Sequence, residues 1–600
     1  MRHRLDRSLV LLTLLRVQTA LAAVFFQSPD QLPLNIEYDF IVAGGGTGGG
    51  VVAGRLAENS NWKVLVIEAG PSNREFPATI TPGLYPELQQ GPADWNYTLV
   101  PQSSMNGRST TFARGKLLGG CSSHNGLAYT RGAKDDWDRW AKITGDEGLK
   151  WDNMLPFIFR AERLVVDSEN QTQVDHLDPA VHGRDGKLLV TNPFTIHPIN
   201  DMILQVPQEL PDEFPFLLDQ NSGRPIGISW TQGTIDHNAE RSSAATGYVE
   251  PSGDNLHVLL NTYVTGVVPT ENGTDLRGVE FAADAQSERK RIHANKEVIV
   301  AGGCIGSPQI LLNSGIGKRE DLEALGIKTL IDNPSVGRNF SDQVYTIMFF
   351  NTTIEDTDYD RDTALAQWNA TRTGPLAKMG HLKNHLVWAR LPDNSTVLSD
   401  HGFDDPSPGF NAPHYEINTS QISKTLPNTH GEIPVPELGN VTTLQIQVIN
   451  LHPVSRGSIT LNSSDPFAYP NIDVGLLLED VDLVILREAI RGAQRLFSAP
   501  VFKDNIFGSV YPASNVTSDE DLEVFIRGSA GPYLHGGGSA AMSPQGASWG
   551  VVDPDFRVKG TTGLRVVDAS VFPRVPSGHT QAAVYGLAER ASHLITNRWE

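Results

Sequence analysis

YDFIVAGGGTGGG, at residues 38–50, is the stretch that decides the fold of this chain. An apolar run leads straight into the spaced glycines Gly44, Gly46 and Gly49, and a segment of helical character follows them. A second apolar run, residues 64–67, then ends on an acidic residue. This order is typical of a βαβ unit that binds a dinucleotide.

Each position of the motif has a physical role. Gly44 permits the tight turn, Gly46 lets the backbone approach a pyrophosphate, and Gly49 lets helix and strand pack closely. The start of the helix offers free N–H groups and a partial positive charge to the pyrophosphate. Glu68 is placed to accept hydrogen bonds from a ribose diol. The motif alone predicts a dinucleotide and leaves NAD and FAD both open.

The size and charge of the chain limit its class. Six hundred residues exceed what one core usually organises, so two domains are expected. A net charge of -21 argues against nucleic acid or an anionic membrane as a partner, because both carry negative charge. The histidines show no metal-ligand spacing, so no metal is expected. Two cysteines, Cys121 and Cys304, cannot form a disulfide framework.

The N-terminus predicts export. Basic residues precede the apolar run 9–15, and Ala20-Leu21-Ala22 resembles a signal-peptidase site, so residues 1–23 are interpreted as a signal peptide. The run is too short to span a bilayer, which predicts a secreted, soluble mature protein. Eleven Asn-x-Ser/Thr sequons support this route and predict N-glycans: Asn96, Asn170, Asn272, Asn339, Asn351, Asn369, Asn394, Asn418, Asn440, Asn462 and Asn515.

The chain divides into alternating stretches of two kinds, which predicts α/β plus α+β architecture. Residues 38–160, 236–345 and 550–600 carry strand and helix patterns of a discontinuous Rossmann-like domain, which includes strands near 258–260, 264–268, 297–300 and 564–567. Residues 161–235 and 346–549 are richer in Pro, Asn and Asp and carry alternating strands such as 443–448. We interpret them as an inserted antiparallel-sheet domain that binds substrate, with the active site between the domains.

Five further motifs resemble the glucose–methanol–choline (GMC) family of flavin oxidoreductases. Residues 115–132 read GKLLGGCSSHNGLAYTRG and are similar to the first family signature, while residues 303–317 read GCIGSPQILLNSGIG and are similar to the second. Cys304 departs from the small residue usual there. Residues 241–246, 336–339 and 564–570 also match. The resemblance covers essentially the whole mature chain, and it implies that the dinucleotide is FAD.

The resemblance assigns cofactor contacts by matching positions. Gly119 and His124 fall in a form of the first signature that resembles choline oxidase, where the histidine is joined covalently to the flavin. A histidine that only packs beside the ring is the alternative, and both stay open. The residues expected to bind the cofactor are Gly44, Gly46, Thr47, Gly48, Gly49, Glu68, Ala69, Gly119, His124, Asn125, Gly126, Leu127, Ala128, Val264, Asp568, Ala569, Thr580 and Gln581.

Two histidines near the C-terminus match the catalytic pair of the family. His535 precedes three glycines, and the resemblance makes it the general base that takes the alcohol proton while hydride leaves for flavin N5. His579 precedes Thr580 and Gln581, and the resemblance in this stretch is to aryl-alcohol oxidases. Choline oxidase has Asn at the position of His579. The helix that begins there is expected to direct its positive end to the flavin.

The combined prediction is a secreted FAD-dependent enzyme that oxidises a primary alcohol, of aromatic or secondary-metabolite type as in patulin synthase. The electron acceptor, O₂ or another compound, stays open. The alternative is a non-redox lyase or cyclase that keeps FAD as a structural group, similar to versicolorin B synthase. In that case His535 serves as acid and base.

Overall fold

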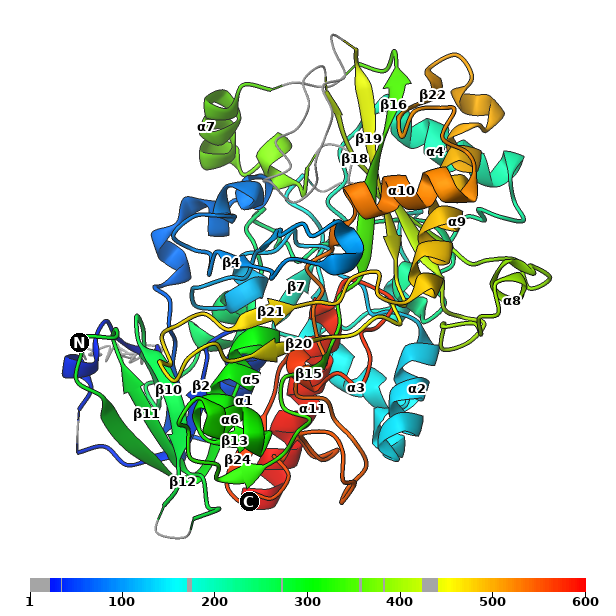
Figure 1. Ribbon diagram of the computed structural model, residues 1–600. Coiled ribbons are helices and arrows are strands. Elements are labelled where there is room, and N and C mark those ends of the chain that lie inside the picture. The colour runs from blue at the N-terminus through cyan, green and yellow to red at the C-terminus, as the bar shows by residue number, and fades with distance from the viewer. Residues whose placement is uncertain are drawn as a thin grey trace, which may run out of the picture.

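The computed structural model describes residues 22–33, 35–169, 175–270, 273–355, 359–380, 384–423 and 441–600. The opening motif folds as a parallel βαβ unit at the centre of an eight-stranded sheet, which lies low in Figure 1. Its order is β1-β9-β3-β2-β12-β11-β10, with β24 also paired to β12. The strands are β1 (Val24–Phe26), β2 (Tyr38–Ala43), β3 (Val64–Ile67), β9 (Leu256–Leu259), β10 (Tyr263–Val268), β11 (Gly278–Ala282), β12 (Lys290–Val300) and β24 (Leu564–Val566).

A second, antiparallel sheet of seven strands stands above the first. Its order is β22-β16-β19-β18-β17-β8, with β23 paired to β16. The strands are β8 (Gly227–Trp230), β16 (Val344–Thr352), β17 (His385–Ala389), β18 (Tyr415–Ser423), β19 (Thr443–Asn450), β22 (Ile506–Tyr511) and β23 (Gly531–Pro532). Smaller sheets are formed by β4 (Tyr97–Thr98) with β5 (Thr111–Phe112), β6 (Glu162–Leu164) with β7 (Leu188–Val190), β13 (Ile316–Gly317) with β14 (Ile331–Asp332), and β15 (Arg338–Phe340) with β20 (Gly457–Thr460) and β21 (Asn471–Asp473).

Helices cover both sheets. The C-terminal helix α11 packs against α1 beside the parallel strands, and α9 packs on β18 and β19. The α-helices are α1 (Thr47–Leu56), α2 (Lys134–Thr144), α3 (Trp151–Ala161), α4 (Pro198–Glu209), α5 (Gly303–Asn313), α6 (Arg319–Ala324), α7 (Arg361–Thr371), α8 (Val397–Asp400), α9 (Asp480–Phe497), α10 (Asp519–Ser529) and α11 (Gln581–Trp599).

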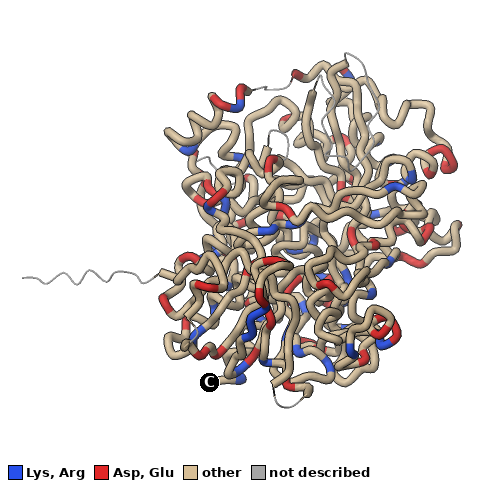
Figure 2. The backbone as a smooth tube through the Cα atoms, turned by 60° about the vertical axis from the view of Figure 1, so that its left-hand side comes forward, with Lys and Arg blue, Asp and Glu red and all other residues tan. Residues whose placement is uncertain are grey.

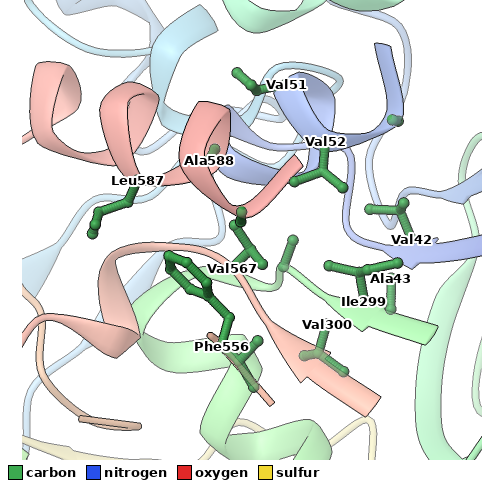
Figure 3. Close-up of a cluster of buried hydrophobic side chains, with 14 of the residues drawn as sticks. Val42, Ala43, Val51, Val52, Ile299, Val300, Phe556, Val567, Leu587 and Ala588 are labelled. Atoms are coloured by element: carbon green, nitrogen blue, oxygen red, sulfur yellow. The ribbon is translucent and has the colours of Figure 1, made fainter. Parts of the chain in front are cut away.

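Each sheet has its own apolar core. Val42, Val52 and Val300 lie among the buried side chains between the parallel strands, α1 and α11, as Figure 3 shows. A separate cluster fills the space between the antiparallel sheet and α9. Lys and Arg are interspersed with Asp and Glu over the backbone (Figure 2).

The expected fold class is confirmed: a Rossmann-like unit is combined with an antiparallel sheet, and strands occupy the predicted stretches. The exact division into domains stays a prediction. Most of the signal-peptide interpretation, residues 1–21, lies outside the described residues, as do Asn170, Asn272 and Asn440. In the part of the chain that the structure describes, no helix has the length and apolar character needed to cross a membrane.

Candidate active site

A cavity of about 540 Å³ runs between the two sheets and collects almost all of the predicted site residues. Its wall includes Gly44 at the opening motif and the distant pair His535 and His579. The predicted residues that line it are Gly44, Gly46, Thr47, Gly48, Glu68, Ala69, His124, Asn125, Gly126, Leu127, Ala128, Val264, His535, Asp568, Ala569, His579, Thr580 and Gln581. Gly49 and Gly119 do not line it and lie just behind its wall.

The glycine turn brings backbone close to the cavity for a steric reason. Gly44 has φ +108°, and a Cβ there would lie 2.4 Å from the carbonyl oxygen of Ala301. A Cβ on Gly49 would lie 2.0 Å from the carbonyl oxygen of Gly44, so side chains are excluded at both positions. Gly46 has no neighbour closer than 3.8 Å to such an atom, which leaves its backbone open to a ligand.

Two carboxylates lie on the cavity wall near this turn. The Glu68 carboxylate accepts hydrogen bonds at 2.8 Å from the backbone N–H groups of Gly45 and Gly70, and burial raises its pKa to about 7. Asp568 accepts hydrogen bonds from the Gly303 N–H at 2.9 Å and from the Ser307 hydroxyl at 2.5 Å. The fixed carboxylate of Glu68 suits ribose hydroxyls, which donate hydrogen bonds.

His124 is buried in the cavity wall. Its Nε2 lies 3.3 Å from the Leu88 carbonyl oxygen and 3.8 Å from Asp94 Oδ2. Burial lowers its pKa to about 4, so the imidazole is neutral at physiological pH. A neutral imidazole keeps a lone pair on one ring nitrogen, which a covalent bond to a cofactor requires.

The start of α11 offers both a positive helix end and an unused acceptor. The side-chain N–H group of Gln581 donates to the carbonyl oxygens of Leu127 and Ala128, at 3.1 and 2.6 Å. Its Oε1 is buried and has no hydrogen-bond partner among the described residues. A buried acceptor costs free energy until a donor reaches it, so this end of the cavity fits a ring system that carries N–H groups.

His535 is held by its backbone and by its ring. The two carboxylate oxygens of Asp342 accept from the backbone N–H groups of Leu534 and His535, at 2.9 and 2.6 Å. Leu534 adopts φ +65°, a left-handed conformation that a bulky side chain rarely takes without such support. Burial, with the neighbouring His579 and Arg114, holds the pKa of His535 well below its ordinary value. The imidazole is therefore neutral and can accept a proton.

His579 lies beside His535 and has a carboxylate behind it. The two ring centroids are 4.9 Å apart. Nε2 of His579 lies 3.3 Å from both carboxylate oxygens of Glu416, on β18. Glu416 is fully buried and also accepts from the Trp388 indole N–H at 2.9 Å and the Tyr533 hydroxyl at 3.3 Å. The Glu416 carboxylate therefore holds the His579 ring in place beside His535.

The antiparallel sheet gives the cavity a polar wall near the two histidines. Side chains of β18 and β19 line it, and most of them carry amides: Asn418, Ser420, Gln421, Gln445 and Gln447. Asn418 donates to the Tyr533 hydroxyl at 3.1 Å. Asn418 Oδ1 and Gln445 Oε1 are buried without a hydrogen-bond partner among the described residues.

Sequence reasoning missed three features of this site. Gln343 lies only four residues after the matched motif 336–339, so that motif could have pointed to it as a site residue. Arg114 lines the cavity one residue before the first signature, and its positive charge adds to burial in lowering the pKa of His535. For Glu416 no local pattern existed, because its side chain contacts His579 across a separation of 163 residues in the sequence.

Comparison with known proteins assigns the family. Models of the GMC oxidoreductase family match residues 38–345 and 453–588. The chain belongs to the GMC oxidoreductase family. It is 54% identical over 595 residues to pyranose dehydrogenase of Agaricus xanthodermus, covering 99% of this chain and 98% of that protein. It is 53% identical over 599 residues to pyranose dehydrogenase 3 of Leucoagaricus meleagris, covering 99% of both.

A solved GMC structure has the same fold. Formate oxidase of Aspergillus oryzae superposes with a TM-score of 0.83 at 27% identity, over 94% of this chain and 99% of that chain. The expected cofactor and reaction class are confirmed: this is a FAD-dependent oxidoreductase that acts on CH–OH donors. The cavity fits that cofactor, because it combines an open glycine turn, a carboxylate at the ribose position and an unused acceptor on Gln581.

Proposed function

We propose that this GMC enzyme is a secreted dehydrogenase that oxidises a hydroxyl group of a pyranose-type sugar. The amide-lined wall carries the proposal. Sugar hydroxyls donate hydrogen bonds, and the buried acceptors Asn418 Oδ1 and Gln445 Oε1 have no donor within the described part of the chain. An aromatic alcohol leaves such acceptors unsatisfied, at a cost of about 1–3 kcal/mol each. The names of two relatives at 53–54% identity agree with a sugar substrate.

The two histidines divide the proton chemistry. FAD, when bound, supplies the hydride acceptor at flavin N5. His535 is neutral and takes the proton of the substrate hydroxyl. His579, with the Glu416 carboxylate 3.3 Å from Nε2, stabilises the negative charge that develops on the substrate oxygen. The remaining site residues bind and orient the substrate.

Three further expectations belong to the same proposal. Residues 1–23 direct export, and the exposed sequons Asn96, Asn369, Asn394, Asn462 and Asn515 carry N-glycans. The sequon Asn418 does not, because its side chain lies inside the protein against Tyr533. His124 is joined covalently to the flavin.

A substrate panel with two readouts tests this proposal. Purified protein is assayed with monosaccharides, benzylic alcohols and short primary alcohols, and peroxide formation is measured beside reduction of a quinone-type dye. We expect turnover of monosaccharides with the dye and little peroxide. Turnover of benzylic alcohols alone would favour the aromatic substrate expected from the sequence, and peroxide at the rate of dye reduction would make the enzyme an oxidase. The non-redox alternative predicts neither readout.

A further inference from the structure

The side chain of Gln343 connects the two catalytic histidines. Its Nε2 donates to the carbonyl oxygens of Pro576 and Gly578, at 2.9 and 3.2 Å. Its Oε1 lies 2.7 Å from Nδ1 of His535. Gln343 is completely buried, so water does not compete for either end. One amide therefore contacts the ring of His535 and the loop that leads directly into His579.

The chemistry of the partners fixes the direction of each bond. Backbone carbonyls only accept hydrogen bonds, so the NH₂ end of Gln343 must face Pro576 and Gly578. The oxygen end then faces His535, and an amide oxygen only accepts. Nδ1 of His535 must therefore carry the ring proton. In a neutral imidazole this leaves the lone pair on Nε2, which is the atom a general base needs.

We propose that Gln343 is a positioning residue that fixes the reactive tautomer of His535 and ties it to the loop carrying His579. The inference rests on the proposed role of His535 as general base. A purely structural clamp would hold the loop equally well but would not depend on which ring nitrogen of His535 carries the proton.

Other groups around His535 do not replace this contact. The Tyr533 ring centroid lies 4.7 Å from that of His535, and the His579 ring lies 4.9 Å away with Glu416 behind it. Asp342 contacts the His535 backbone rather than the ring. Arg114 lowers the pKa of His535 through its charge. None of these makes a hydrogen bond to Nδ1 among the described residues, so the proton on Nδ1 depends on Gln343.

The test compares the pH dependence of anaerobic flavin reduction in Gln343→Glu, Gln343→Met and wild-type holoenzyme. A carboxylate at this position stabilises protonated His535, so Gln343→Glu moves the acid limb to higher pH by roughly one to three units. Its midpoint of thermal unfolding falls, because a carboxylate faces two carbonyl oxygens. If Gln343→Glu does not fold, Gln343→Met carries the test. It removes the acceptor and slows reduction roughly ten-fold with the substrate KM unchanged.

Asp136→Asn is the matched control. Asp136 accepts from the Ser577 N–H at 3.0 Å and so holds the same loop without touching His535. We expect this variant to lose thermal stability while its acid limb stays where the wild type has it. An unmoved limb in Gln343→Glu, or wild-type rates in Gln343→Met, would overturn the inference. His535→Asn distinguishes failure of the Gln343 inference from failure of the proposed function. If this variant reduces its flavin as fast as wild type, His535 is not the general base.

Discussion

Nε2 of His579 lies 3.3 Å from both carboxylate oxygens of Glu416, and the two residues belong to separate parts of the fold. His579 stands at the entry to α11, beside the parallel sheet, whereas Glu416 belongs to β18 of the antiparallel sheet. Trp388 also donates to the carboxylate, at 2.9 Å, which fixes its orientation. The antiparallel sheet therefore contributes a carboxylate to the proposed catalytic pair as well as one wall of the cavity.

Glu416→Gln tests the contribution of that charge. The variant keeps the size of the side chain but removes the negative charge 3.3 Å from Nε2 of His579. His579 is then held less firmly and stabilises the developing substrate alkoxide less well. We expect kcat to fall roughly ten- to hundred-fold with little change in KM. Trp388→Phe, which removes only the donor to Glu416, serves as control and should cost less than Glu416→Gln. Equal steady-state rates in Glu416→Gln and wild type would show that the charge has no role.

Gln445→Leu tests the amide wall. It removes a buried acceptor that has no partner among the described residues and is proposed to receive a sugar hydroxyl. Loss of one such bond should raise KM for the monosaccharide roughly ten-fold and leave kcat nearly unchanged. Gln494→Leu, on α9 outside the cavity, is the matched control. A Gln445→Leu enzyme with unchanged KM for every sugar would remove the main support for a sugar substrate.

His124→Ala tests the covalent bond to FAD. Wild-type protein precipitated with acid should keep its yellow colour in the pellet, because a covalent flavin stays with the denatured chain. The variant should release the flavin to the supernatant and still show folded far-UV circular dichroism. Colour in the wild-type supernatant would mean that His124 only packs beside the ring.

His182, a buried histidine outside the cavity, is expected to make the free energy of unfolding fall at alkaline pH. Both ring nitrogens of His182 face carboxylates, Glu162 at 2.5 Å and Asp219 at 2.8 Å, and these bonds raise its pKa to about 9 against the burial that lowers it. The folded protein thus holds a proton that the unfolded chain releases near pH 6.5. The stabilisation is complete below that pH and is lost as pH rises through about 9. It amounts to on the order of 3 kcal/mol.

His182→Gln provides the measurement. Wild-type unfolding free energy should fall between pH 7 and 9.5, whereas the variant should be less stable at pH 7 and flatter across that range. The variant leaves the carboxylates of Glu162 and Asp219 with one positive partner fewer, which accounts for its lower stability. Parallel curves for the two proteins would show that His182 is not the titrating group.

The sequence predicted those parts of the site that depend on local spacing. Gly44 and Glu68 follow from a turn and a strand end, and His535 and His579 follow from family motifs. Glu416 and Gln343 could not be placed in the same way. Glu416 reaches His579 only after the antiparallel strands have set their register, and Gln343 contacts a loop 233 residues further along the chain. Such contacts arise from tertiary packing rather than from any local pattern.

The polar wall of the cavity also arises from tertiary packing, so the sequence could not be used to predict the substrate from it. The sequence prediction of an aromatic alcohol came from the residues around His579, which bind near the reacting atoms. The side chains that are proposed to meet the rest of the substrate come from β18 and β19, whose facing amides are adjacent only in the folded sheet. The register that pairs Asn418 with Gln447 brings amides together on one surface, and no motif marks that surface in the sequence.

Anaerobic mixing of the wild-type holoenzyme with a free monosaccharide shows directly whether the enzyme takes hydride from a sugar with His535 as the base. We expect the visible flavin band to bleach within the time of a single turnover, and His535→Asn to slow this bleaching by about 10²–10⁴-fold. A flavin band that persists with every monosaccharide, or that bleaches only with a benzylic alcohol, would contradict this expectation.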